Sequence, residues 1–367
     1  MPFALELDKL AVDAVAVRLE PALNALGSAL LVARQEDDLG VHEWVGKTRA
    51  AMSKDEQFRH RLIMIGLHYA VVPEESYPSF SQYLSALEAA APEVLRDRML
   101  AVYADFCDKD KEGTPQEPVD WKEILSSARS YVKFLRRGFD EQHVFEELET
   151  RAYDYVIDPP AMKQLILDHL RWFWSNYLER EWVRVRPMIE KSVRAFQRVD
   201  FSDLSPLEAA RLVTGQDLAD MHWHGMLLKA EKITFIPNAH IGPYVQKAMM
   251  NGTLHVSFGV RQPDSLEERI PELDRADIVS RLAALADDTR LQILHMIGEA
   301  GELRAQDVMD ATQLSQPSVS RYLSQLTATG YLQERRVSGA KVYALNRDRI
   351  EKTIRATSAF LLDAGRR

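Results

Sequence analysis

The sequence predicts a mainly α-helical protein, in which an α-helical N-terminal domain with a small β-sheet precedes a C-terminal α+β module. Three observations predict this class. Apolar residues recur at helical spacing through most of the chain, and β-prone runs are short and confined to a few places. The 367 residues also exceed what one hydrophobic core usually holds, so two domains are expected.

Three β-prone runs are expected to form the small sheet of the N-terminal domain. They occupy residues 3–8, where Phe3, Leu5 and Leu7 alternate with small or acidic residues, and residues 232–236 and 253–260. Between these runs, capping residues and prolines mark where helices begin and end. Ser79 or Ser81 opens one helix, Pro92 begins the next, Asp120 with Glu123 forms a capping box, Gly138 ends that helix, and Pro159 and Pro160 precede a long one.

The composition is that of an ordinary soluble protein, with 46% hydrophobic and 28% charged residues. The sequence contains no run of about 18 apolar residues that could span a bilayer, and no signal-peptide pattern begins it. The single cysteine, Cys107, excludes an intramolecular disulfide and fits a reducing compartment. We therefore expect a cytoplasmic protein with no membrane partner.

The C-terminal module is expected to begin with two helices. Apolar residues recur at i, i+4 and i+7 over residues 278–285, which lines one face of a helix. A second helix is expected from Thr289, capped by Asp288, and Gly298 and Gly301 end it. Its expected inward residues are Leu291, Leu294 and Ile297.

A short helix around residues 305–311, a turn at 312–314 and a fourth helix follow. Ser315 is a suitable N-cap for the fourth helix, and Pro317 fits its first turn, where backbone amides have no helical partner. The inward positions are Val319, Tyr322, Leu323 and Leu326. The side chains expected to face outward or sideways are Gln316, Ser318, Ser320, Arg321 and Gln325. Hydroxyls, amides and arginine can bond base edges, so this helix is the candidate reader of a DNA major groove.

Two further β-prone runs, residues 331–337 and 341–345, flank Ser338, Gly339 and Ala340, which is a hairpin signal. Basic side chains near the tip can contact backbone phosphates, so the order of elements is that of a winged helix-turn-helix with this hairpin as the wing. The predicted DNA-binding residues are Ser315, Gln316, Ser318, Ser320, Arg321, Gln325, Arg335, Arg336 and Lys341. A helical hairpin domain, or a winged helix used for protein contacts, is the alternative.

Two segments of the module resemble the signature segments of ArsR-family repressors: residues 285–294, LADDTRLQIL, and residues 314–323, LSQPSVSRYL. The resemblance covers about the last quarter of the chain. It implies a transcriptional regulator that dimerises and binds an imperfect palindrome in double-stranded DNA. It also implies that residues 346–367 form a dimerisation helix, for which packing on its own domain is the alternative. The layout of the whole chain resembles actinobacterial-type ArsR-like regulators that carry a large N-terminal domain.

The module departs from the metal sensors of that family at two places. The thiol sensors carry Cys-x-Cys on the third helix, whereas residues 303–307 here are Leu-Arg-Ala-Gln-Asp. Another family site uses Asp and His on the C-terminal helix, but residues 346–362 contain Asp348 and no histidine. We therefore expect no metal site and no cofactor.

Charge is divided unevenly along the chain. Residues 276–367 carry 13 Lys and Arg against 11 Asp and Glu, whereas residues 1–275 carry 33 against 44. The acidic part would repel phosphate at close range, so it is expected to point away from DNA and to do another job. The predicted division is a helical domain at 1–260, a linker at 261–275, the winged helix-turn-helix at 276–345 and the dimerisation helix at 346–367.

The aromatic run at residues 172–174 is the best candidate wall for an effector pocket. Trp174 shares a helix face with Leu170 and Leu178 that is expected to be core, whereas Trp172 lies off that face beside charged residues. The predicted pocket residues are His169, Trp172, Trp182, His222, His224 and His240. Metal binding is the alternative for His222 and His224, and a structural role is the alternative for His240.

These patterns together predict a homodimeric DNA-binding regulator, a repressor by resemblance, whose N-terminal domain senses a non-metal effector or mediates oligomerisation. No nucleophile elbow, Gly-rich phosphate loop or zinc-binding helix is recognisable in the sequence, so no catalytic residue is assigned. Two alternatives stay open. One is an enzyme tethered to DNA, with a hydrolytic or metal site in the N-terminal domain, and the other is an adaptor whose acidic domain binds another protein.

Overall fold

The computed structural model describes residues 14–34, 40–107, 119–139, 144–216, 218, 223, 225–227, 230–263, 275–337 and 340–362. These residues form two compact units. The helical unit takes Glu20–Gln35 and Trp44–Arg184, and the sheet unit takes Met1–Leu19, Glu36–Glu43 and Val185–Arg367, in each case within the described residues. The division predicted from the sequence, with boundaries after residues 260, 275 and 345, differs from these two units. That division stays a prediction.

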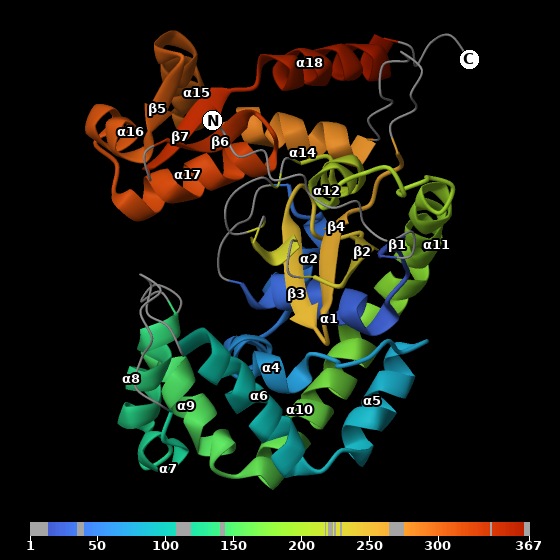
Figure 1. Cartoon of the computed structure of the whole chain (residues 1–367), viewed down its shortest axis with the longest axis vertical. Coiled ribbons are helices and arrows are strands. Elements are labelled where there is room, and N and C mark those ends of the chain that lie inside the picture. Colours follow the sequence, from blue (N-terminus) through green and yellow to red (C-terminus); the bar gives the residue numbers. More distant parts are fainter. Residues whose placement is uncertain are drawn as a thin grey trace. The chain divides into compact units, whose positions relative to one another are not determined.

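The mainly α-helical class is confirmed (Figure 1), and the side chains of Ser53, Ser79, Asp120, Ser127 and Asp158 cap the first turns of five helices in the helical unit. Ser79 rather than Ser81 opens α5, because the Ser79 hydroxyl accepts a hydrogen bond from the Gln82 amide at 3.2 Å. The single helix expected up to Gly138 is two, because Ser127 caps a second one. The α-helices are α1 (Pro21–Ala33), α2 (Glu43–Ala51), α3 (Lys54–Arg61), α4 (His68–Val71), α5 (Phe80–Ala89), α6 (Pro92–Cys107), α7 (Trp121–Ile124), α8 (Ala128–Gly138), α9 (Glu146–Val156), α10 (Pro159–Phe173) and α11 (Glu179–Phe196).

Two π-helical segments interrupt these helices. The first, η1 (Leu62–Gly66), follows α3 directly, and the second, η3 (Trp174–Leu178), joins α10 to α11. A π-turn accommodates an extra residue in a helix and is frequent at functional sites. Both segments lie next to the helices that carry a buried histidine pair, described below. None of the helices within the described part of the chain has both the length and the apolar character that crossing a bilayer requires.

The sheet unit contains a four-stranded sheet in the order β1-β2-β4-β3, made of β1 (Val15–Val17), β2 (Lys232–Asn238), β4 (Thr253–Gly259) and β3 (Val245–Met250). β1, β2 and β4 are parallel, and β3 pairs antiparallel with β4. The core lies between this sheet, the end of α11 and α12 (Pro206–Thr214), where Phe196 and Val213 pack near Phe235 and Phe258. The strand predicted at residues 3–8 lies outside the described residues.

The described residues 275–362, called the C-terminal module below, have the predicted winged helix-turn-helix order (Figure 1). A three-stranded sheet in the order β5-β7-β6 carries the wing. The core is apolar and includes Ile293, Ile297, Val319, Leu323 and Leu326. The elements are α14 (Arg275–Leu285), α15 (Asp288–Ala300), β5 (Glu302–Arg304), α16 (Ala305–Thr312), α17 (Gln316–Ala328), β6 (Leu332–Val337), β7 (Ala340–Leu345) and α18 (Arg347–Leu362).

Two predicted details of α15 are wrong. Asp287, not Asp288, is the N-cap, since its carboxylate accepts a hydrogen bond from the Arg290 amide at 2.9 Å. Leu291 is 49% exposed rather than inward. The buried face of α15 is Arg290, Ile293, Leu294 and Ile297, so Leu294 and Ile297 are inward as predicted and Arg290 takes the place expected for Leu291.

Candidate nucleic-acid interface and ligand cleft

The candidate reader helix α17 is amphipathic and presents polar side chains at its N-terminal end. α16 ends at Gln313, whose left-handed backbone (φ 57°) turns the chain before α17 begins. Ser315 takes the extended N-cap conformation, and its hydroxyl lies 3.0 Å from that of Ser318 instead of bonding a helix amide. Ser315, Gln316, Ser320 and Arg321 are exposed, and Ser318 is half-buried. These side chains are therefore available to a nucleic acid.

Gln325 does not share that surface, and its predicted outward position is wrong. It is 5% exposed, and its side-chain oxygen accepts from Arg290 Nη1 at 3.5 Å. The buried Arg290 guanidinium also donates to the carbonyls of Ala284 and Ala283, at 2.8 and 3.0 Å. Gln325 and Arg290 thus fix the end of α14 against α15 and α17.

The wing carries basic side chains that are already paired with acidic ones. Arg335 is exposed and forms an ion pair with Glu302, and Lys341 Nζ lies 2.7 Å from Glu334 Oε1. Arg336 pairs with Lys341 across the hairpin by its backbone, while its side chain and residues 338–339 lie outside the described parts of the chain. Contacts of this wing with phosphate would compete with these ion pairs.

An apolar surface lies on the two helices at the ends of the module. On α18, Thr353 and Ala356 are buried, while Ile354, Phe360, Leu361 and Leu362 are between 48 and 74% exposed. On α14, which packs against α18, Val279 is 57% exposed. Large exposed side chains of this kind are typical of a surface that meets another protein.

A separate cleft of about 420 Å³ lies in the helical unit. This volume falls within the usual range of small-molecule sites. Its lining combines half-buried apolar walls with two charged side chains that are exposed: Arg59, Tyr155, Leu165, Asp168, His169 and Trp172.

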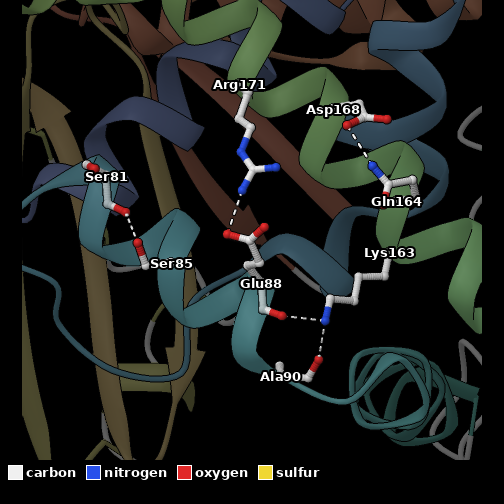
Figure 2. A network of polar contacts seen from close by, with 8 residues as sticks. All are labelled: Ser81, Ser85, Glu88, Ala90, Lys163, Gln164, Asp168 and Arg171. Carbon is white, nitrogen blue, oxygen red and sulfur yellow. Dashed lines mark hydrogen bonds and ion pairs between the residues drawn. The ribbon is translucent and has the colours of Figure 1, made fainter.

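Contacts between α5 and α10 hold one side of this cleft in place (Figure 2). Lys163 Nζ donates to the carbonyls of Glu88 and Ala90, and Arg171 forms an ion pair with Glu88 at 2.6 Å. Asp168 accepts a hydrogen bond from Gln164 one turn earlier, at 2.7 Å, apart from that cluster. The cleft residues of α10 are therefore carried on a firmly packed helix.

His169, which lines the cleft, belongs to a buried pair of histidines. His60 Nδ1 lies 2.8 Å from His169 Nε2, and His60 Nε2 lies 2.8 Å from the Ala29 carbonyl. Phe173 stacks on the His60 ring with 4.5 Å between centroids. Burial lowers the pKa of His60 to about 4 and that of His169 to about 3, where the charge of His60 contributes further. Both imidazoles are therefore neutral at pH 7.

Two of the six predicted pocket residues, His169 and Trp172, meet in this cleft. Trp182 is half-buried on α11 and does not line it. His240 lies in the sheet unit, buried, where its amide donates to Asn238 and its carbonyl accepts from the His42 amide at 3.1 Å. His222 and His224 lie outside the described residues. Arg59, His60 and Tyr155 were missed, because nothing near them in the sequence links them to residue 169.

Comparison with known proteins gives the C-terminal module a family. Residues 287–334 match the family described as bacterial regulatory protein, arsR family. The arsenic resistance transcriptional regulator ArsR1 of Pseudomonas putida is 46% identical over 59 residues, which are 16% of this chain and 45% of that protein. Its ArsR2 counterpart is 34% identical over 87 residues, 22% of this chain and 76% of that protein. The arsenical resistance operon repressor of Escherichia coli is 44% identical over 52 residues, 14% of this chain and 44% of that protein.

The chain thus spans a little under half of two of these relatives and about three quarters of the third. The residues matched by the family lie wholly within the C-terminal module and include all of α15, α16 and α17. This extent of similarity, together with the winged helix-turn-helix order, means that the chain belongs to the ArsR family of bacterial regulatory proteins.

Proposed function

We propose that this protein is a sequence-specific DNA-binding transcriptional regulator that works as a homodimer and represses its target promoter. One observation carries the proposal. In a module of this family, α17 buries its apolar face and leaves Gln316, Ser320 and Arg321 exposed at its N-terminal end. That is the end which helix-turn-helix proteins place against base edges in the major groove. No catalytic step is part of the proposal.

The proposed dimer surface is formed by α14 and α18. A single reader helix contacts few base pairs, and two related copies read two half-sites one helical turn apart. The exposed Val279, Ile354, Phe360, Leu361 and Leu362 provide the apolar surface that such a dimer needs. We expect Ile354→Ser combined with Leu361→Ser to yield monomers in sedimentation velocity, whereas Lys352→Ser, on a charged and exposed position of α18, leaves the dimer intact.

The test of DNA reading compares a selected operator with a scrambled duplex. The operator is obtained by selection from random duplexes, and affinity is measured by fluorescence anisotropy at several salt concentrations. Arg321→Ala should weaken operator binding by about 1 to 3 kcal/mol and scrambled DNA much less, since arginine pairs with guanine through two hydrogen bonds. Lys341→Ala should weaken both duplexes and reduce the salt slope by about 1.

Gln292, exposed on α15 away from these residues in the sequence, provides the control, and Gln292→Ala should change neither affinity. Equal losses on both duplexes for Arg321→Ala would remove its role as a base reader. If the wild-type protein selects no sequence at all, the regulator proposal fails as a whole.

We further propose that the cleft in the helical unit is the effector site of this regulator. The support is its volume of about 420 Å³ and the convergence of two predicted pocket residues, His169 and Trp172, with charged and aromatic side chains. An effector there would alter operator affinity by favouring one conformation of the protein over another. The natural readout is therefore operator binding with and without a ligand of the cleft.

A further inference from the structure

The hydrogen-bond pattern of the buried histidines fixes which nitrogen carries each proton. The Ala29 carbonyl can only accept, so His60 Nε2 donates to it. A neutral imidazole has one proton, so His60 Nδ1 is an acceptor and takes the proton of His169 Nε2 at 2.8 Å. His169 Nδ1 is then an unprotonated nitrogen with a lone pair.

That nitrogen has no hydrogen-bond partner among the described residues. His169 is 3% exposed, and its Nδ1 atom is buried and unpaired. Most buried polar atoms of folded proteins are paired, because an unmet acceptor destabilises the fold. His169 also lines the cleft, but its Nδ1 atom lies beneath the cleft surface, so a molecule in the cleft can supply the missing donor once the covering side chains move aside.

The remaining walls define what kind of molecule fits. Trp172, with its ring centroid 5.3 Å from that of His169, and the half-buried Tyr155 and Leu165 offer flat apolar surface. Arg59 disfavours a cationic ligand by its charge, and the Asp168 carboxylate, which accepts a hydrogen bond from Gln164, disfavours an anionic one. The π-helical turns η1 and η3, which follow the two histidine-bearing helices, are a second sign that this region departs from ordinary core packing.

We propose that the cleft binds a small, flat, uncharged aromatic molecule that donates an N–H or O–H hydrogen bond to His169 Nδ1. The binding site stands on the geometry alone. Only its assignment as an effector site rests on the proposed regulatory function.

The test uses the full-length protein and two probes that differ in one donor. Indole carries a ring N–H, and 1-methylindole has nearly the same shape but no donor. Calorimetric titration should show indole binding about tenfold more tightly than 1-methylindole, as expected for one buried hydrogen bond. In protein labelled with ¹⁵N-histidine, indole should shift the His169 Nδ1 resonance, while 1-methylindole leaves it in place.

Two variants locate the site without disturbing the histidine pair. Leu165→Trp fills the cleft and should abolish indole binding, whereas Gln164→Ala, next to it on α10 but outside the lining, should keep it. Both are first compared with the wild type by circular dichroism. Equal affinities for the two probes, or an unmoved His169 resonance with indole bound, would overturn the proposal.

Operator binding is measured in parallel to separate the two proposals. Indole that binds the cleft and changes operator affinity supports both. Indole that binds without changing operator affinity supports the site and removes the effector role. A protein that binds indole through His169 but selects no operator leaves the site established and overturns the regulatory function.

Discussion

The C-terminal module and the helical unit both bury titratable side chains, but they differ in how these are paired among the described residues. In the module, the three donating nitrogens of Arg290 reach two backbone carbonyls and Gln325. In the helical unit, His169 Nδ1 and Glu149 Oε2 are buried without a hydrogen-bond partner among the described residues. Arg290 holds the helices it contacts in fixed positions, whereas His169 and Glu149 can still respond to a ligand or to a proton.

The largest effect on stability is expected when the hydrogen bonds of Arg290 are removed. Arg290→Met keeps most of the buried volume but removes the donors to Ala283, Ala284 and Gln325. Urea denaturation followed by circular dichroism should show about 3 kcal/mol lower free energy of unfolding for the C-terminal module. Arg355→Met, on an exposed arginine of α18, is the control and should cost far less. A loss below about 1 kcal/mol for Arg290→Met would mean that these bonds contribute little.

The buried carboxyl group of Glu149 should make the protein less stable as pH rises. A salt-bridged carboxylate has the opposite effect, since it stabilises the fold as pH rises. Burial raises the pKa of Glu149 from 4.5 to about 8, so the folded protein keeps a proton that the unfolded chain has lost. Its contribution is therefore complete below about pH 4.5 and is lost as pH rises towards 8, by about 1 kcal/mol per pH unit.

Glu149→Gln mimics the protonated acid and should flatten this part of the profile, so that the variant is about 2 kcal/mol more stable than the wild type at pH 6, and the difference should grow up to pH 8. Glu93→Gln, an exposed acid on α6, is the matched control. Denaturation curves between pH 5 and 8 provide the measurement. A Glu149→Gln profile parallel to that of the wild type would show that Glu149 does not retain its proton.

A smaller effect is expected at the cap of α15, where two adjacent aspartates are available. Asp287→Ala removes the bond to the Arg290 amide and should lower the free energy of unfolding by about 1 kcal/mol. Asp288→Ala, at the first residue of the helix, loses no such bond and should cost less. Thermal denaturation of the two variants side by side tests this, and equal losses would contradict the assignment of Asp287 as the cap.

The smallest effect on stability is expected for the ion pair between Lys341 and Glu334 on the wing. Glu334→Gln removes the partner of Lys341, whose Nζ lies 2.7 Å away, and should leave stability within about 0.5 kcal/mol of the wild type. The released lysine should raise affinity for operator and scrambled DNA alike, by roughly threefold at low salt. Fluorescence anisotropy with both duplexes measures this change in affinity. Gln333→Ala, an exposed neighbour on β6, is the control, and an increase confined to the operator would contradict the prediction.

The module was predictable from sequence because its signals are local. Caps, helical spacing and a hairpin signal each act within a few residues, so the order of elements follows from them. The errors arise where a residue distant in sequence determines whether a side chain is buried. Gln325 was expected to face outward or sideways because helical spacing assigned the inward face to apolar residues, but Arg290 on another helix provides it with a buried partner.

The cleft was only partly predictable for the same reason. Trp172 and His169 were chosen from one helix, whereas His60 meets His169 across 109 positions of sequence, which no local pattern reports. One local signal was overlooked. Asn251 and Gly252, both with positive φ, form the turn between β3 and β4, and Asn-Gly is the strongest short-range hairpin signal in a sequence.

The pairing of β1 with β2 has a consequence for the order in which the protein folds. Val15 lies opposite Ile233, and all of the helical unit is synthesised between them. The four-stranded sheet therefore cannot close until that unit has emerged, and closing so long a loop makes this step entropically costly and slow. Refolding experiments should accordingly show the helices forming early and the pairing of β1 with β2 last, and until then β1 remains an unpaired strand that is open to aggregation.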